Sequence, residues 1–242
     1  MIKIALLGSS GKMGCAVLEV VDADNSVLIS NAIVRSNSDS LGMDVKSVHS
    51  KVKTELKFVD YPNQEFDLFL DFSTNFNLDE KIKMFEEFNK PLIFCGTGLS
   101  DPDEKRIKSL SLSMPVMFAP NTSIGVNAMI DFLKRMKKSL DVTNITIEEK
   151  HHISKIDAPS GTARDISNQL EIAADEIISI RDQSVENYHK IGLICKNEKF
   201  EITHFGLNRK LYAEGAINIA KWFYQKPKNL YYMQTLIKEI YE

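Results

Sequence analysis

Residues 148–163 of the sequence, EEKHHISKIDAPSGTA, bring together several groups that could do acid–base chemistry. His151 and His152 are adjacent, and Lys155 follows the first of them by four positions. An imidazole exchanges protons near neutral pH, and a lysine supplies a mobile cation. Pro159 precedes the pattern of a capped helix start, whose free backbone N–H groups attract anions. The segment therefore predicts a proton donor beside a carboxylate or phosphate cradle made by Ser160, Gly161 and Thr162.

Two other interpretations of this segment remain open. It could be an ordinary polar loop in which His152 is a surface side chain. It could also bind a metal ion through the two histidines. The metal interpretation ranks third, because adjacent histidines point to opposite sides of a strand and the sequence has no HxH motif, HExxH motif or nearby cysteine to complete a ligand set.

A second candidate site lies near the beginning of the chain, in residues 4–14, IALLGSSGKMG. Gly8, Gly11 and Gly14 form a GxxGxxG spacing between an expected strand and an expected helix. Such glycines let the chain turn tightly and let backbone N–H groups approach a pyrophosphate at the helix N-terminus. The spacing alone is equally compatible with a turn that binds nothing. Its position directly after a strand favours dinucleotide binding.

The end of the second expected strand indicates which dinucleotide would bind. An Asp or Glu about 20 residues beyond the glycines usually accepts hydrogen bonds from the ribose of NAD. Here the expected strand ends in Val34, and Arg35 and small polar residues follow it. An arginine suits a 2′-phosphate, although taken alone it could be a solvated residue at a strand end. Together with the glycines it predicts NADPH as the favoured cofactor, with NADH possible.

Hydrophobic patterning predicts the elements that must position these groups. Short apolar runs alternate with amphipathic helical patterns up to about residue 121, which indicates βαβ units and a parallel sheet covered by helices on both faces. After an amphipathic helix that begins near Ser123, strand-like segments follow one another with a single helix among them, at about 162–174. The patterns at 209–225 and 230–241 are predicted helices.

The predicted fold class is α/β, with an N-terminal doubly wound, Rossmann-type parallel sheet plus an α+β second domain with a mostly antiparallel sheet. The predicted boundaries assign residues 1–121 and 210–242 to a dinucleotide-binding domain. Residues 122–209 are then the substrate-binding and oligomerisation domain.

Composition limits the classes of function. The 242 residues carry a net charge of -3, so there is no overall basic field, and we expect neither a nucleic acid nor a membrane as a partner. No apolar run approaches the roughly 18 residues of a membrane span, and the N-terminus lacks the pattern of a secretory signal. The three cysteines are far apart and lack CxxC spacing, which argues against a disulfide framework and predicts a cytoplasmic protein.

The segment 148–163 resembles the signature E-x-H-H-x-x-K-x-D-A-P-S-G-T-A of the 4-hydroxy-tetrahydrodipicolinate reductase family, also called dihydrodipicolinate reductases. Residues 4–14 resemble the family's GxxGxMG start, residues 118–127, FAPNTSIGVN, its hinge, and residues 201–222, EITHFGLNRKLYAEGAINIAKW, its C-terminal motif. The resemblance spans nearly the whole chain. It implies a nicotinamide-dependent reductase of a cyclic, unsaturated imine dicarboxylate in diaminopimelate and lysine biosynthesis, usually a homotetramer.

The resemblance also implies roles for individual residues. His151 would be the general acid that protonates the developing enamine, and Lys155 would assist the proton transfer and hold a carboxylate. No metal is implied. Substrate would be bound by His152, Lys155, Ser160, Gly161 and Thr162. The cofactor would be bound by Gly8, Gly11, Lys12, Met13, Gly14, Arg35, Phe72, Ser73, Gly96, Thr97, Ala119 and Asn121.

Three positions depart from the family pattern. Val34 stands where the family often has Glu, which removes a ribose contact that supports NADH. The loop after the fourth expected strand is CGTG, at residues 95–98, where the family has GTTG or GTSG. The segment 180–192 is shorter than the family's corresponding loop, which affects expected contacts between subunits.

Two rival functions stay open at this point. Another two-domain NADP-dependent reductase of a small imine or keto acid would keep the glycine turn without needing the double histidine. A regulatory or scaffold protein could have kept the fold and lost the catalytic activity. In such a protein we expect the polar residues of the motif to be replaced, and here they are all present.

Overall fold

The structure is a computed structural model that describes residues 1–75, 77–183 and 186–241. These residues divide into two compact units, Met1–Thr122 with Tyr212–Glu242, and Ser123–Leu211. Within the described residues, no helix is long and apolar enough to cross a membrane. Each unit has its own sheet and its own hydrophobic core.

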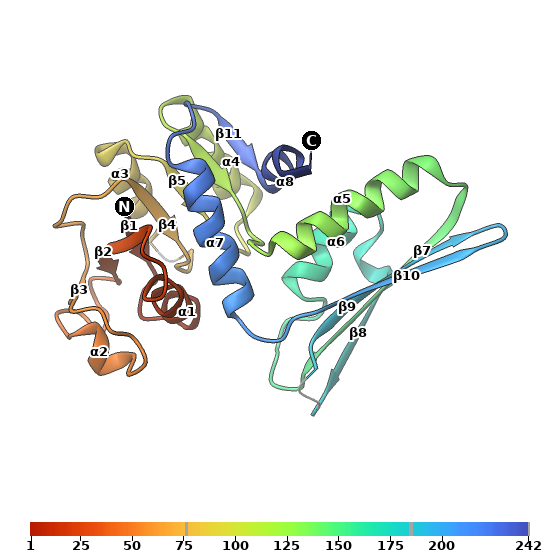
Figure 1. Cartoon of the computed structure of the whole chain (residues 1–242), viewed down its shortest axis with the longest axis horizontal. Helices are drawn as coiled ribbons and strands as arrows, with labels where there is room; N and C mark the ends of the chain where they lie inside the picture. Colours follow the sequence, from red (N-terminus) through yellow and green to blue (C-terminus); the bar gives the residue numbers. More distant parts are fainter. Residues whose placement is uncertain (76, 184–185, 242) are drawn as a thin grey trace. The chain divides into compact units, whose positions relative to one another are not determined.

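The first unit is built on a seven-stranded sheet in which every pairing is parallel (Figure 1). The strand order is β11-β6-β5-β4-β1-β2-β3, so the order reverses between β1 and β4. In open parallel sheets, ligands bind outside the carboxyl ends of the strands at such a reversal. The strands are β1 Ile2–Leu7, β2 Val27–Ile33, β3 Phe58–Val59, β4 Leu68–Asp71, β5 Leu92–Phe94, β6 Val116–Phe118 and β11 Leu230–Tyr232.

Helices cover both faces of this sheet because its strands are apolar on both sides. On one face, α3 and α4 bury an aromatic-rich cluster that includes Phe69, Phe85 and Phe94. Lys221 of α7 forms an ion pair with Asp24, three residues beyond the end of α1. The helices are α1 Lys12–Val21, α2 Val45–Val48, α3 Leu78–Phe88, α4 Asp101–Ser109, α7 Lys210–Phe223 and α8 Met233–Tyr241, with a 3₁₀ turn at Leu110–Leu112.

The second unit has a four-stranded sheet in the order β10-β9-β7-β8. Its pairings are antiparallel except β7 with β8, which is parallel. Two helices lie on one face of the sheet and bury its apolar side (Figure 1). The elements are β7 Val142–His152, β8 Ile177–Asp182, β9 Tyr188–Cys195, β10 Lys199–Phe205, α5 Ile124–Ser139 and α6 Gly161–Leu170, with a 3₁₀ turn at Ala174–Glu176.

The structure confirms the predicted fold class and corrects three local expectations. The helix expected at about 162–174 ends at Leu170, because Glu171 adopts a left-handed conformation with φ of 58°. Residues 177–182, for which no element was expected, form β8 on the edge of the sheet. Residues 230–232, expected to be helical, form β11, because pairing with β6 outweighs the local helical pattern.

Candidate active site

The predicted phosphate-binding turn follows β1, and two of its glycines are required by close backbone packing. Gly8 has φ of 75°, and a Cβ on it would lie 2.8 Å from backbone atoms of Ser73 at the end of β4. A Cβ on Gly14 would lie 2.4 Å from the carbonyl oxygen of Gly8. Larger residues would therefore push the first turn of α1 away from the loop, and the free N–H groups there would no longer converge.

A cavity of about 520 Å³ lies beside this turn, at the carboxyl ends of β1, β2 and β4. Its lining includes five predicted cofactor residues, Gly8, Gly11, Arg35, Phe72 and Ser73. Seven others do not line it. Lys12, Met13 and Gly14 lie in α1, and Gly96, Thr97, Ala119 and Asn121 follow β5 and β6 at the same edge of the sheet.

A buried ion pair that the sequence analysis did not predict borders the same cavity. Lys81 Nζ lies 2.9 Å from Asp71 Oδ2 and also donates a hydrogen bond to Ser73 Oγ. Asp71 ends β4 and is fully buried, and Lys81 is 8 % exposed. The ion pair ties α3 to the strand end from which Phe72 and Ser73 extend. The sequence did contain a signal for this ion pair, because Asp71 is a charged residue at the end of an otherwise apolar strand.

The two histidines of the central motif lie at the end of β7 and point to different environments, as expected for neighbours on a strand. His151 is half-buried, and its Nδ1 is hydrogen-bonded to the carboxylate of Glu149, two residues earlier on the same face. His152 is exposed, and its Nδ1 lies 2.8 Å from Ser154 Oγ. The side chain of His151 is therefore the better protected of the two candidate proton donors.

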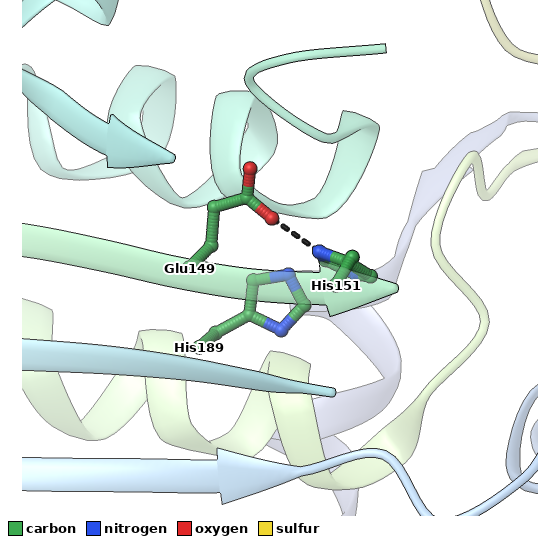
Figure 2. Close-up of side chains that lie close together, drawn as sticks. All are labelled: Glu149, His151 and His189. Carbon is green, nitrogen blue, oxygen red and sulfur yellow. Dashed lines mark hydrogen bonds and ion pairs between the residues drawn. The ribbon is translucent and has the colours of Figure 1, made fainter. Parts of the chain in front are cut away.

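Glu149 belongs to a row of polar side chains that crosses the second sheet. The strand registers place it beside Ser179 of β8 and His189 of β9, and His189 beside His204 of β10. Figure 2 shows the carboxylate of Glu149 directed toward His151, with His189 beside the pair. Burial alone would raise the pKa of Glu149, but its hydrogen bond with His151 and the neighbouring Arg181 and Ser179 lower the pKa to about 2. Glu149 is thus a carboxylate at neutral pH.

His189 contacts this pair as an uncharged imidazole. Burial, followed by the nearby charge of His151, lowers its pKa from 6.5 to about 3. Its Nε2 lies 3.2 Å from Ser160 Oγ, which already accepts a hydrogen bond from the backbone N–H of Ala163. Ser160 thus links the start of α6 to the neutral imidazole on β9.

The predicted anion cradle is the N-terminus of α6. Ser160 caps the helix and is buried, so its hydroxyl is engaged within the unit, whereas Gly161 is exposed and Thr162 half-exposed. Lys155 Nζ lies 2.8 Å from the carboxylate of Asp157. Burial alone would raise the pKa of Asp157, but Lys155 and backbone N–H groups, that of Gly161 included, lower it. The lysine and the helix N-terminus thus already bind one carboxylate, which belongs to the chain itself.

Glu149, His151 and His189 also offer ligand atoms that lie within 4.8 Å of one another, a spacing that a metal ion could bridge. The carboxylate of Glu149 is hydrogen-bonded to His151, and its Oε1 lies 2.8 Å from Arg181 Nη2. A guanidinium at this distance competes with a divalent cation for the same oxygen. The charges around these three residues therefore favour a hydrogen-bonded acid–base site over a metal centre.

Comparison with known proteins places the chain in a family. Residues 2–122 match the domain family described as dihydrodipicolinate reductase, N-terminus, and residues 125–237 match dihydrodipicolinate reductase, C-terminus. The chain belongs to the dihydrodipicolinate reductase family. The 4-hydroxy-tetrahydrodipicolinate reductase of Rickettsia canadensis is 31% identical over 255 residues, which cover 98% of this chain and 99% of the relative. The enzyme of the same name from Pseudoalteromonas atlantica is 28% identical, over 97% and 98% of the two chains.

Solved structures agree in fold with this family assignment. A dipicolinate-bound dihydrodipicolinate reductase from Paenisporosarcina sp. TG-14 superposes with a TM-score of 0.73 at 23% identity, over 96% of this chain and 97% of that one. An aspartate semialdehyde dehydrogenase with NADP from Candida albicans gives a TM-score of 0.53 at 13% identity, over 82% and 72% of the two chains. At these identities the likeness shows the fold and not the chemistry.

Proposed function

We propose that the chain reduces 4-hydroxy-tetrahydrodipicolinate, through dihydrodipicolinate, to tetrahydrodipicolinate in diaminopimelate and lysine biosynthesis. The family assignment over nearly the whole chain supports this proposal. The observation that carries it is the carboxylate of Asp157 held by Lys155 and the α6 N-terminus, next to the His151–Glu149 pair. A cyclic dicarboxylate needs both a carboxylate cradle and a nearby proton donor. The alternative, another two-domain reductase of a small imine or keto acid, is not favoured, because the curated relatives carry this activity in their names.

Each side chain of the site then has a proposed task. A substrate carboxylate exchanges with that of Asp157 and accepts hydrogen bonds from Lys155 and from the N–H of Gly161, while His152 and Thr162 border it. When bound in the first unit, a nicotinamide would supply hydride to the unsaturated ring. The enamine formed in this way takes a proton from His151, and Lys155 assists by holding positive charge beside the developing negative charge. Ser160 keeps the helix start in place through its cap.

The residues of the first unit fit a dinucleotide. A Cβ on Gly8 or Gly14 would fill the space into which the turn folds, and the adjoining cavity brings Arg35, Ser36 and Ser38 together. A cation flanked by hydroxyls suits a 2′-phosphate, so NADPH is the proposed cofactor. NADH stays possible, because Asp60 also lines the cavity and offers an acceptor for ribose hydroxyls.

The cellular setting proposed here is a homotetramer in the cytoplasm. The family resemblance suggests the tetramer. None of the three cysteines, all of which lie in the described part of the chain, forms a disulfide, which suits a reducing compartment. Part of the segment 180–192, which differs in length from the family loop, lies outside the described residues. Light scattering coupled to size-exclusion chromatography measures the subunit number.

The test of the proposed activity is loss of NADPH absorbance with substrate freshly generated by the synthase that precedes this step. We expect consumption only when that substrate is present. The variant His151→Gln should lower kcat by something on the order of 10²-fold and change KM much less. Consumption with other imino or keto acids but none with this substrate would establish the rival reductase. No consumption with any of them would favour a regulatory or scaffold role.

A further inference from the structure

Two side chains outside the predicted site, Glu149 and Arg181, connect the proton donor to the carboxylate cradle. The carboxylate of Glu149 accepts a hydrogen bond from His151 Nδ1 (Figure 2) and lies 2.8 Å from Arg181 Nη2 through its other oxygen. The same guanidinium donates to the carbonyl oxygen of Asp157, whose side chain pairs with Lys155. One arginine therefore contacts both the partner of the proton donor and the loop that holds the cradle.

The sheet itself sets this arrangement. In the parallel pairing of β7 with β8, His151 lies opposite Arg181, and Glu149 lies opposite Ser179. Glu149 is fully buried, and the side chain of Arg181 is 15% exposed. Taking two charges out of water is costly, so a buried pair such as this contributes little net stability. The contacts of the pair suggest that it serves instead to fix the orientation of His151.

We propose that Glu149 and Arg181 are positioning residues of the reductase reaction. Glu149 keeps a proton of His151 on Nδ1, so that Nε2 is the atom that donates to substrate, and Arg181 holds Glu149 and the cradle loop in one arrangement. This inference rests on the proposed function for its kinetic consequences, but the position of the proton is a property of the free protein.

The chemistry follows from the hydrogen-bonding capacity of each group. A carboxylate only accepts, so His151 must present an N–H to it. In the proton transfer, the Nε2–H bond of the imidazolium breaks and a C–H bond forms at the enamine carbon, whose electron pair takes the proton. The imidazole left behind is neutral and keeps its Nδ1–H on Glu149. A carboxylate at this position therefore stabilises the imidazolium before the transfer and selects the correct tautomer after it.

The direct test is Glu149→Gln, which keeps the shape of the side chain and removes its charge. Arg181 will attract the amide oxygen of the glutamine, so the amide NH₂ group faces His151 and Nδ1 must accept. In ¹⁵N spectra of histidine-labelled protein, recorded where the imidazoles are neutral, we expect the proton of His151 to move from Nδ1 to Nε2. We expect kcat to fall by something on the order of 10²-fold with a much smaller change in KM.

Two further variants separate positioning from a general loss of structure. Arg181→Lys keeps the charge near Glu149 but cannot bridge two acceptors with a planar fork, so KM for the dicarboxylate should rise more than kcat falls. Glu148→Gln is the matched control, because Glu148 precedes Glu149 on the opposite face of β7 and accepts a hydrogen bond from Tyr188. It should leave both the tautomer and kcat unchanged.

If Glu149→Gln does not fold, the double variant Glu149→Leu/Arg181→Met replaces the charged pair with apolar groups and leaves no charge unpaired. It also removes the acceptor at Nδ1, so the same loss of the Nδ1 proton and of kcat is expected. The proposal is overturned if His151 keeps its Nδ1 proton in these variants, if kcat stays at the parent value, or if Glu148→Gln causes the same losses. A parent protein without reductase activity would refute the proposed function, and the spectra would still decide the position of the proton.

Discussion

At the scale of single residues, the chemistry of both units depends on a few charged side chains and on the groups that contact them. In the first unit the decisive cation is Arg35, which lines the cavity beside the glycine turn. In the second unit the decisive charges are those of Glu149, Arg181 and Lys155, and His189 is held neutral among them.

Replacing Arg35 should change cofactor preference. A charged hydrogen bond to a 2′-phosphate contributes roughly 1.5–3 kcal/mol, so Arg35→Ala should weaken NADPH binding by about 10- to 100-fold and leave NADH binding nearly unchanged. Calorimetric titration with each cofactor measures both affinities. Arg106→Ala, on the exposed surface of α4, is the matched control and should change neither. If Arg35→Ala weakens the binding of both cofactors equally, Arg35 does not bind the 2′-phosphate.

The buried His189 should make stability depend on pH. Its folded pKa of about 3 lies below the ordinary 6.5, so below pH 6.5 only the unfolded chain takes up the proton. The free energy of unfolding should therefore fall as the pH drops from 6.5 toward 3, by at most about 1.4 kcal/mol per pH unit. Urea unfolding at several pH values between 6.5 and 4.5 measures this dependence. Glu149 does not contribute in this range, because the stability that its lowered pKa provides is lost only between pH 4.5 and about 2. His189→Gln should flatten the slope, whereas exposed His152→Gln should not. Parallel slopes for parent and His189→Gln would contradict the assignment.

At the scale of elements, the first unit was predictable in outline because its signals are local. Strand-like runs alternate there with helical patterns. In the second unit a local signal also held, because Ser123 caps α5 by accepting from Val126 at 3.2 Å, as expected from its type and position. β8 was not predictable from its own residues. Ile177 and Ile178 interrupt an alternating pattern, and the strand is defined by its ladder with β7, which begins 35 positions earlier at Val142.

The same contrast applies to the candidate site. Glu149 stands two residues before His151 on a predicted strand. Because side chains two residues apart on a strand point to the same face, the sequence alone could have paired these two residues. Arg181 could not be found in this way, because its contact with Glu149 depends on the pairing of β8. The burial of Ser160 and its bond to His189 likewise depend on packing between α6 and β9.

Removing one partner of the ion pair between α3 and the end of β4 should destabilise the first unit. Lys81→Met leaves the fully buried Asp71 without its cation, which should lower the free energy of unfolding by about 3–5 kcal/mol. Lys83→Met, on the exposed side of the same helix, should change it by less than about 0.5 kcal/mol. Adding Asp71→Asn to Lys81→Met should recover part of the loss. Similar urea midpoints for the two lysine variants would show that the pair does not hold α3 to β4.

At the scale of the whole molecule, the proposed cofactor and substrate sites belong to different units, and the chain passes between the units twice, at residues 122–123 and 211–212. Hydride transfer requires both ligands in contact, so we expect their binding to be coupled. Pyridine-2,6-dicarboxylate has the same two carboxylates and cannot be reduced. It should bind more tightly when NADPH is present, and it should tighten NADPH by the same factor, because coupling free energies are reciprocal.

Calorimetry with each ligand, in the presence and absence of the other, measures this coupling. Lys155→Ala is the informative variant, because it should abolish binding of the analogue and leave the affinity for NADPH intact. If the analogue binds Lys155→Ala as well as it binds the parent, the cradle at the start of α6 is not the carboxylate site. If the two ligands bind independently in the parent protein, the expected coupling between the cofactor and substrate sites is wrong.

The central claim is that hydride passes from a nicotinamide to the ring of the substrate while His151 supplies the proton. It is tested most directly with NADPH deuterated at C4 of the nicotinamide on the transferred face, and with mass spectrometry of the product. We predict that tetrahydrodipicolinate carries one deuterium per cofactor oxidised, and that His151→Gln slows the reaction without changing where the label appears. Oxidation of NADPH without deuterium in the product, or transfer at the parent rate by His151→Gln, would contradict the account.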